Sequence, residues 1–358
     1  MSNNGNPLKR PRILICRLSH IGDCILTLPL LSALRRSMPQ AWIAWAVEKP
    51  TPQLLEHHPE LDELITIPKG WLKKPKSIAQ VRRQLRSYAF DIALDPQSIA
   101  KSSLLAWVSG AKTRIGFKGE YGRELSPLFN NQCIEPTSSH LVDRSLELLQ
   151  CLDVEYQTPV FNLPLRDSAT CYINQFLMER GLAENRYFVI NPGASWPSKR
   201  WENDRFGEVA RSLHQQTGLL PIVSWAGDEE LEMATTICAN SGGAAILAPP
   251  TDLQQLAALL QDAEIYLGCD TGPLHMAAAL GTRCVGLYGP TRPQDSGAYG
   301  QIHFALQNEY QSGTSRERRR GSNRAMKTIT VPQVINTCCR ALAANRIAAV
   351  KSSIERAA

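Results

Sequence analysis

The chain has 358 residues, of which 43% are hydrophobic and 20% charged, so it can form two domains that each enclose an apolar core. No apolar run reaches the roughly 18 residues that a membrane span needs. Charged residues also interrupt the first apolar run before it could serve as an export signal. The ten cysteines include no C-x-x-C pair, which favours buried free thiols over a metal site or disulfides. These features predict a cytosolic protein.

The net charge of +6 is unevenly distributed along the chain. Residues 1–150 carry +7, residues 151–315 carry −9 and residues 316–358 carry +8. A basic front and a basic tail fit an anionic partner, such as a phosphorylated substrate or an anionic membrane, although a solvated basic surface would give the same pattern. Nucleic acid is disfavoured as the partner because aromatic residues do not interleave with the basic ones.

Short apolar segments alternate with amphipathic segments along the first part of the chain. We expect strands at 12–18, 41–48, 91–96 and 113–117, and helices at 30–38, 81–88, 101–111 and 140–152.

A second alternating set follows a proline-containing linker near 155–170. Strands are expected at 186–194, 220–227, 244–249, 264–270 and 283–290, and helices at 205–218, 228–242, 252–263, 273–281 and 331–353. Such alternation builds parallel sheets with helices on both faces, so the pattern predicts an α/β protein with two sheet domains.

Residues that carry chemistry follow the predicted strands, where open parallel sheets bind their ligands. "RLSHIGDCILTLP" follows the first strand and contains Asp23, which is either a helix N-cap or a general base. This loop lacks G-x-G-x-x-G, which disfavours a Rossmann dehydrogenase, and no Walker sequence occurs elsewhere.

Three further stretches begin at strand ends in the second set. "NPGASWPSKRW" offers the Ser195 hydroxyl and the Lys199 and Arg200 cations for a phosphate, or is an exposed loop. "WAGDEELEMA" offers Glu229 or Glu230 to ribose hydroxyls, whereas Asp228 would suit a helix cap.

The third stretch, "CDTGPLHMAAALGT", predicts a strand followed directly by a helix that begins near Pro273 and ends at Gly281. Its start is expected to present unpaired amides of Thr271, Gly272 and Leu274 to a phosphate or sugar oxygen. Asp270 suits sugar hydroxyls, and His275 is either a phosphate donor or a packed core histidine. "YGPT" would close the same pocket. No D-x-D pair is present, so Lys199 and backbone amides would stabilise a diphosphate without a metal ion.

These stretches, in this order, resemble the heptosyltransferases of bacterial lipopolysaccharide assembly, glycosyltransferase family 9. The resemblance is carried by "SHIGDCILTLP", "DPQSIAKSSLLAWVSGAKTRIGF", "NPGASWPSKRW" and "CDTGPLHMAAALGT" with "LYGPT". It implies a GT-B architecture, in which two Rossmann-like domains face one another across a cleft. The domains are expected at 1–165, which binds the acceptor, and 166–330, which binds the nucleotide sugar. A C-terminal helix at 331–358 is expected to cross back to the first domain.

The resemblance implies inverting, metal-independent transfer of a heptose from ADP-heptose to a Kdo or heptose acceptor in the lipopolysaccharide inner core, with no cofactor. Asp23 would be the general base and Lys199 would stabilise the leaving diphosphate. The implied donor residues are Ser195, Glu230, Thr251, Asp270, Thr271, Gly272, Leu274 and His275. The basic residues proposed for the anionic acceptor are Arg17, Lys69, Lys101 and Arg123.

Two alternatives remain at this point. A glycosyltransferase of the same fold could use another nucleotide sugar, and a non-catalytic two-domain sugar-binding protein could use the same loops without needing Asp23. The resemblance also implies a cytoplasmic enzyme, with peripheral contact at the inner face of the cytoplasmic membrane through its basic tail.

Overall fold

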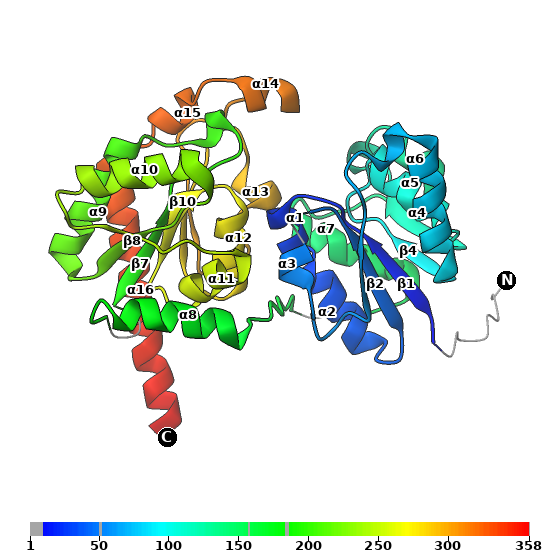
Figure 1. The fold of residues 1–358 in the computed structure, drawn as a ribbon, viewed down its shortest axis with the longest axis horizontal. Helices are drawn as coiled ribbons and strands as arrows, with labels where there is room; N and C mark the ends of the chain where they lie inside the picture. Colours follow the sequence, from blue (N-terminus) through cyan, green and yellow to red (C-terminus); the bar gives the residue numbers. More distant parts are fainter. Residues whose placement is uncertain (1–9, 50–51, 157, 183–185, 358) are drawn as a thin grey trace. The chain divides into compact units, whose positions relative to one another are not determined.

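The computed structural model describes residues 10–49, 52–156, 158–182 and 186–357, with side chains as far as residue 345. The chain divides into two compact units between Pro164 and Leu165, one residue from the boundary expected from the sequence. Each unit contains one six-stranded sheet, and every described strand pair in both sheets is parallel (Figure 1).

The first sheet has the strand order β3-β2-β1-β4-β5-β6, with β1 and β4 at its centre. Its central strands are buried on both faces, as expected for a parallel sheet between helical layers. The strands are β1 (Arg12–Cys16), β2 (Trp42–Val47), β3 (Glu63–Thr66), β4 (Ile92–Leu94), β5 (Thr113–Phe117) and β6 (Gln132–Ile134).

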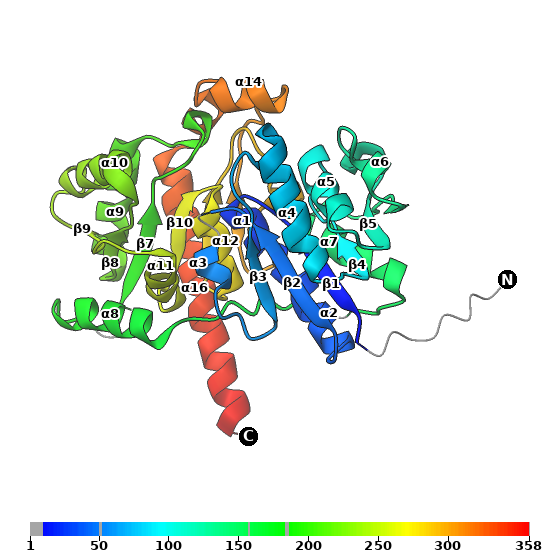
Figure 2. The ribbon, with the colours of Figure 1, turned by 45° about the vertical axis from the view of Figure 1, so that its right-hand side comes forward.

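Two helices supply much of one apolar layer of this unit. Val81 and Leu85 of α4, with Leu105 of α5, pack against Leu14 and neighbouring strand residues. In both views α4, α5 and α6 lie side by side (Figure 1, Figure 2). The helices are α1 (Ile21–Ile25), α2 (Leu28–Ser37), α3 (Pro52–Leu55), α4 (Pro75–Ser87), α5 (Ala100–Val108), α6 (Ser126–Phe129) and α7 (Leu141–Glu147), with 3-10 turns at η1 (Trp71–Lys73), η2 (Gly119–Tyr121) and η3 (Leu148–Leu152).

The second sheet has the order β12-β11-β10-β7-β8-β9, so β10 and β7 are central neighbours although they are distant in sequence. The strands are β7 (Tyr187–Asn191), β8 (Leu220–Val223), β9 (Ile246–Leu247), β10 (Tyr266–Cys269), β11 (Cys284–Leu287) and β12 (Phe304–Leu306).

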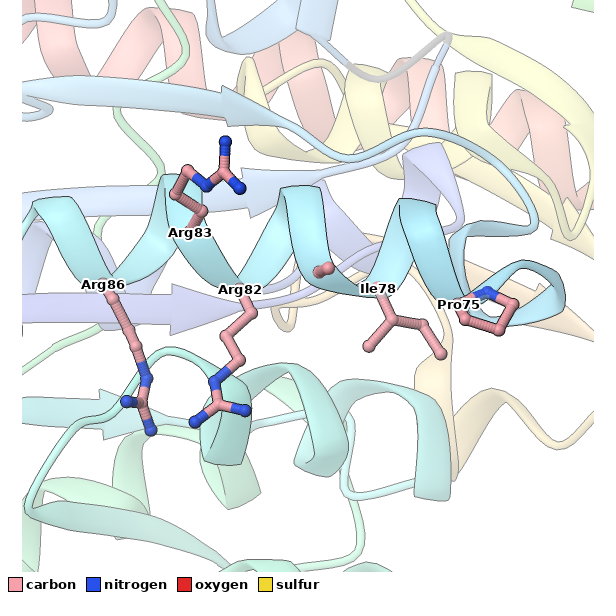
Figure 3. Close-up of a pocket in the computed structure, with 6 residues that line it drawn as sticks. Pro75, Ile78, Arg82, Arg83 and Arg86 are labelled. Carbon is pink, nitrogen blue, oxygen red and sulfur yellow. The ribbon is translucent and has the colours of Figure 1, made fainter.

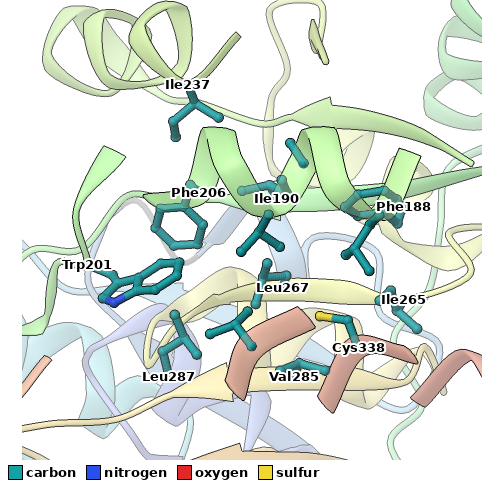
Figure 4. Close-up of a cluster of buried hydrophobic side chains, with 14 of the residues drawn as sticks. Phe188, Ile190, Trp201, Phe206, Ile237, Ile265, Leu267, Val285, Leu287 and Cys338 are labelled. Atoms are coloured by element: carbon teal, nitrogen blue, oxygen red, sulfur yellow. The ribbon is translucent and has the colours of Figure 1, made fainter. Parts of the chain in front are cut away.

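One face of the second sheet is covered by α9, α10 and α16. Phe206 of α9, Ile237 of α10 and Cys338 of α16 meet Ile190 and Leu267 in a single buried cluster (Figure 4). On the other face, the Tyr187 hydroxyl donates to the backbone of Leu259 in α11. The helices of this unit are α8 (Asp167–Met178), α9 (Asn203–Thr217), α10 (Gly227–Asn240), α11 (Leu253–Gln261), α12 (Gly272–Ala279), α13 (Pro293–Ser296), α14 (Ser315–Arg320), α15 (Arg324–Lys327) and α16 (Val331–Ala357), with a 3-10 turn at η4 (Pro197–Lys199).

The expected elements are present, and the structure adds three strands, the helix α8 and several short helices that were not predicted. β3, β6 and β12 were not predicted, and the helix expected at 140–152 is divided into α7 and η3. The last helix, α16, packs on α9, β11 and β12 of the second unit. Its crossing to the first unit stays a prediction.

The expectation that the cysteines are buried holds for only half of them. Cys16, Cys24, Cys269, Cys284 and Cys338 are buried thiols, four others are half-buried, and Cys171 is exposed. Among the described helices, none has an apolar stretch long enough to span a membrane.

Candidate functional site

The carboxyl edge of the first sheet carries a row of charged residues, because the segment that follows each of the strands β1 to β5 contains one. Arg17 follows β1, Glu48 follows β2 and Lys69 follows β3. Lys101 and Arg123 come after β4 and β5. The carboxyl ends of parallel strands meet at one edge, so the fold gathers the four residues predicted for the acceptor along this edge.

Asp23 is the third residue of α1 and not its N-cap, a position occupied by His20. Its Oδ2 atom lies 3.0 Å from Nη2 of Arg17 and accepts a hydrogen bond from the His20 amide at 3.3 Å. Both contacts fall on the same oxygen, and Oδ1 has no partner in the described parts of the chain. The side chain is 34% exposed. Asp23 is therefore held in place with one oxygen open to a ligand.

Arg17 is almost completely buried and connects Asp23 to the loop after β4. Its Nη1 atom donates to the carbonyl of Pro96 at 3.2 Å. That loop is fixed by Asp95, a fully buried carboxylate that accepts bonds from the Ser98 amide at 2.9 Å and from the Asn130 side chain at 3.1 Å. Burial raises the pKa of Asp95 despite these bonds. A buried polar network thus supports the arginine that contacts Asp23.

The other basic residues of this edge differ in how they are held. The Lys101 Nζ atom lies 2.5 Å from the buried Glu48 carboxylate, whereas Lys69 and Arg123 are exposed. Elsewhere in this unit, α4 borders a hollow of about 400 Å³ whose lining is apolar and cationic (Figure 3). Arg82 and Arg86 point to one side of α4 and Arg83 to the other. The residues lining this hollow are Pro75, Ile78, Ala79, Arg82, Arg83 and Arg86.

In the second unit, the predicted donor residues also lie after successive strands. Thr251 follows β9, Glu230 follows β8, Lys199 follows β7 and Asp270 follows β10. Since these strands are adjacent in the order β9-β8-β7-β10, the residues form a row in this sequence along the carboxyl edge.

Lys199 and Asp270 form the centre of this row. Lys199 Nζ lies 2.7 Å from Asp270 Oδ2 and donates to the Asp270 carbonyl at 3.0 Å. On its other oxygen, Asp270 lies 3.3 Å from Nε2 of His275. Burial alone would raise the pKa of Asp270, but Lys199 and His275 outweigh it and hold that pKa well below its usual value. Asp270 therefore stays ionised, and its charge is balanced by Lys199.

Two glutamates near the row have different partners. Glu229 forms a two-pronged ion pair with Arg200, with N–O distances of 2.5 and 3.0 Å. Glu230 accepts a hydrogen bond from the Ala226 amide at 2.9 Å, and burial raises its pKa. Its carboxylate lies against Gly193, where a Cβ atom would come within 2.2 Å of Oε1. The glycine of the lysine loop is thus the reason that Glu230 can approach the loop.

The start of α12 has fewer open amides than the sequence predicts. The expectation of an unpaired Leu274 amide is wrong, because this amide donates to the Thr271 carbonyl at 3.1 Å. Pro273 has no amide hydrogen and so offers no donor. The amides of Thr271 and Gly272 donate to no group in the described residues. Two amides, and not three, remain for an anion.

The remaining predicted donor residues differ in exposure. Ser195 is exposed and Thr251 is half-buried, whereas His275 is 6% exposed. Sequence reasoning missed Arg17 as a partner of Asp23, and it missed the Glu48–Lys101 pair. It also missed Trp196, whose ring centroid lies 4.6 Å from Lys199 Nζ. Among the described residues, no three His, Cys, Asp or Glu side chains are grouped as a metal site would require.

Comparisons with known proteins show the family and the fold of the chain. The family model of glycosyltransferase family 9 (heptosyltransferase) matches residues 78–325. The chain is 29% identical over 292 residues to lipopolysaccharide core heptosyltransferase OpsX of Haemophilus influenzae, covering 80% of this chain and 82% of that one. It is 28% identical over 306 residues to lipopolysaccharide heptosyltransferase 1 of Pseudomonas aeruginosa, covering 82% and 83% of the two chains.

Solved structures show the same fold. A glycosyl transferase family 9 protein from Veillonella parvula matches with a TM-score of 0.78 and 24% identity, over 95% of this chain and 99% of that one. The heptosyltransferase WaaC of E. coli, solved with ADP, matches with a TM-score of 0.74 and 22% identity, over 92% and 99% of the chains. The expected GT-B fold is confirmed. On the family match and the two relatives, the chain belongs to glycosyltransferase family 9 (heptosyltransferase), and it is a glycosyltransferase.

Proposed function

We propose that this enzyme transfers a heptose from ADP-heptose to the inner core of lipopolysaccharide, at a Kdo or heptose acceptor, with inversion and without a metal ion. Two observations on similar proteins support this choice of donor and acceptor. The relatives from H. influenzae and P. aeruginosa are named lipopolysaccharide heptosyltransferases. E. coli WaaC was solved with ADP and also with ADP-2-deoxy-2-fluoro heptose.

The observation that carries the proposal is the order of residues along the second sheet. Thr251, Glu230, Lys199 and Asp270 follow four adjacent strands. Neighbouring strands lie about 4.8 Å apart, so the row spans roughly 14 Å, comparable with an extended nucleotide sugar. In the proposed complex the adenine lies by Thr251 and the ribose hydroxyls bind Glu230. The diphosphate lies by Lys199 and the exposed Ser195, and the heptose lies by Asp270.

Asp23 is proposed as the general base. Its exposed oxygen, Oδ1, takes the proton of the acceptor hydroxyl while that hydroxyl attacks the anomeric carbon from the face opposite the diphosphate. The bond to the diphosphate breaks as the new glycosidic bond forms, which inverts the anomeric centre. We assign Arg17 a positioning role, because both of its terminal nitrogens are engaged, one by Asp23 and one by Pro96.

The leaving diphosphate gains negative charge during this step. Lys199 and the two open amides of Thr271 and Gly272 are proposed to stabilise it where that charge develops. His275, which is buried beside Asp270, is proposed to orient that carboxylate toward the heptose.

An anionic acceptor fits the charge of the first unit. Lys69 and Arg123 are exposed at the carboxyl edge of its sheet, and α4 adds Arg82, Arg83 and Arg86 around its hollow. We propose that these groups bind the phosphates and carboxylates of the lipid-linked acceptor. The enzyme would then act in the cytoplasm, in peripheral contact with the inner leaflet, and sedimentation with anionic but not neutral vesicles tests this contact.

Mass spectrometry of the product tests the transfer directly. The protein is mixed with ADP-heptose and a Kdo-lipid acceptor in the presence of EDTA, and the acceptor is expected to gain the mass of one heptose. A gain only with UDP-GlcNAc or GDP-mannose would assign another donor. Donor binding without any product, for every donor and acceptor, would indicate a sugar-binding protein.

A further inference from the structure

The arginine-rich helix α14 connects the lysine loop of the donor row, the row formed by Thr251, Glu230, Lys199 and Asp270, with the loop after β11, which lies next to that row. Ser198, in the lysine loop after β7, donates its hydroxyl to the Arg318 carbonyl at 2.5 Å. Arg318 in turn donates from Nη1 to the Pro290 carbonyl at 2.7 Å, in the loop after β11. Thr314 caps the helix by accepting a bond from the Glu317 amide. These bonds fix α14 against the donor row.

Trp196 brings a second cation of this region close to Lys199. The Lys199 Nζ atom lies 4.6 Å from the centroid of the Trp196 ring, and the Arg319 Cζ atom lies 5.0 Å from the same ring. Cations are attracted to the face of an indole, so the ring holds both side chains in one neighbourhood. Arg319 is therefore placed beside the residue proposed to meet the diphosphate.

The charges in this neighbourhood distinguish Arg319 from the other cations. Lys199 is balanced by Asp270, and Arg200 is balanced by Glu229. Arg319 is exposed, and no carboxylate lies within ion-pair distance of it in the part of the chain that the structure describes. Of Lys199, Arg200 and Arg319, Arg319 is thus the one whose charge no described carboxylate balances.

We propose that Arg319 binds the diphosphate of the nucleotide-sugar donor, and that Trp196 positions its guanidinium group. This inference rests on the proposed function and adds a residue to its donor site. A guanidinium donates two parallel hydrogen bonds to phosphate oxygens, which a lysine cannot do. Because the Lys199–Asp270 pair has no net charge, Arg319 would supply positive charge that balances the negative charge of the diphosphate.

The test compares Arg319→Ala with Arg320→Ala, a matched control one residue along the same exposed helix. Calorimetry measures the Kd of each protein for ADP, AMP and adenosine. Arg319→Ala is expected to raise the Kd for ADP about tenfold, to affect AMP less and to leave adenosine unchanged. Arg320→Ala is expected to leave all three unchanged, and equal melting temperatures would exclude unfolding as the cause.

A double-mutant cycle tests the role of Trp196. Trp196→Leu is expected to weaken ADP binding, and the combined Trp196→Leu/Arg319→Ala protein is expected to be little weaker than Arg319→Ala alone. Additive losses would show that Trp196 does not act through Arg319.

Three outcomes would overturn the inference. The first is an unchanged ADP Kd in Arg319→Ala with a raised KM for the acceptor, which would assign Arg319 to the acceptor. The second is an equal loss in both single arginine variants, which would indicate a general field effect. The third is binding of no nucleoside diphosphate by the unmodified enzyme, which would also end the proposed function. If that enzyme binds UDP or GDP instead of ADP, the ADP-heptose assignment fails, and the same comparison on that nucleotide decides the role of Arg319.

Discussion

The Asp23 carboxylate and the Arg17 guanidinium are 3.0 Å apart, and the arginine is almost wholly buried while the aspartate is one-third exposed. The pair therefore has one side fixed to the sheet and one side open to a ligand. Arg17 contacts only Oδ2, so the second oxygen of Asp23 is left for chemistry. This relationship gives two predictions about turnover that separate chemistry from donor binding.

Asp23→Asn is expected to lower turnover by at least about a hundredfold while leaving the Kd for ADP unchanged, because the amide cannot accept the acceptor proton. Steady-state kinetics and calorimetry measure the two quantities. Asp153→Asn, the same change at an exposed residue after η3, serves as the control. Full activity in Asp23→Asn would remove Asp23 from the mechanism.

Arg17→Lys is expected to lower kcat about tenfold with little effect on donor affinity, because one ammonium group cannot span both Asp23 and Pro96 as the guanidinium does. Arg35→Lys provides a matched control, since Arg35 pairs with Asp62 at 2.6 Å away from the carboxyl edge. A raised KM for the acceptor at constant kcat would instead place Arg17 in acceptor binding.

Asp270→Asn is expected to separate nucleotide binding from sugar transfer. Removing the carboxylate releases Lys199 from its pair and relieves repulsion of the diphosphate, so ADP should bind at least about threefold more tightly. Turnover should fall because the heptose contact is lost. Without ligand, the unpaired and mostly buried Lys199 should lower the melting temperature, and ADP should restore it more than in the unmodified enzyme. Weaker ADP binding would contradict this account.

Gly193→Ala is expected to displace Glu230, since the new methyl group would meet its carboxylate. The end of a glutamate side chain moves easily, so stability should change little. Binding of both ADP and adenosine should weaken about tenfold because the ribose contact is lost. The effect should vanish in a Glu230→Ala background, and an unchanged loss there would show that the methyl group acts elsewhere.

Stability is expected to fall as the pH drops from about 6.5 toward 4 because of His303. The pKa of His303 is lowered to about 4, mainly because the ring is buried. A hydrogen bond with the Tyr299 backbone raises this pKa, and the nearby Arg283 charge lowers it. The unfolded chain takes up a proton near pH 6.5, whereas the folded chain does not until about pH 4. The stabilisation is thus present above pH 6.5 and lost across that window, by at most about 3 kcal/mol.

Thermal melting of the unmodified enzyme and of His303→Gln across this range measures the effect. The glutamine oxygen can still accept the bond that the Cys284 amide donates to His303 Nδ1. The melting temperature of the variant should therefore depend less on pH than that of the unmodified enzyme. Identical profiles would assign the acid sensitivity to other groups.

Sequence patterns predicted the central strands and missed three of the four edge strands of the described sheets, all but β9. β1, β2, β7 and β10 are long apolar runs, because strands buried on both faces need apolar residues throughout. β3, β6 and β12 are edge strands of three or four residues with partly exposed side chains, so they lack that signal. These strands form because each pairs with an adjacent strand, β2, β5 or β11, and their own residue pattern does not predict them.

The candidate site was also only partly predictable, because the sequence indicates its residues and not the contacts between them. Residue type and position after a strand were enough to select Asp23, Lys199 and Asp270. The pairing of Lys199 with Asp270 was not predictable, because it joins residues 71 positions apart through the adjacency of β7 and β10. The contact of Arg319 with Trp196 depends on the path of α14, which has no apolar periodicity to predict it.

The strand order of the second sheet also bears on how this enzyme can be redesigned. Each portion of the donor is assigned to the loop of a different strand, with the base nearest β9 and the sugar nearest β10. Exchanging the loop after β9 would then alter the preference for the nucleobase, while Lys199 and the amides proposed to stabilise the leaving diphosphate stay unchanged. If the donor lies as proposed, its specificity is modular, and replacing one connection at a time would change one portion of the donor.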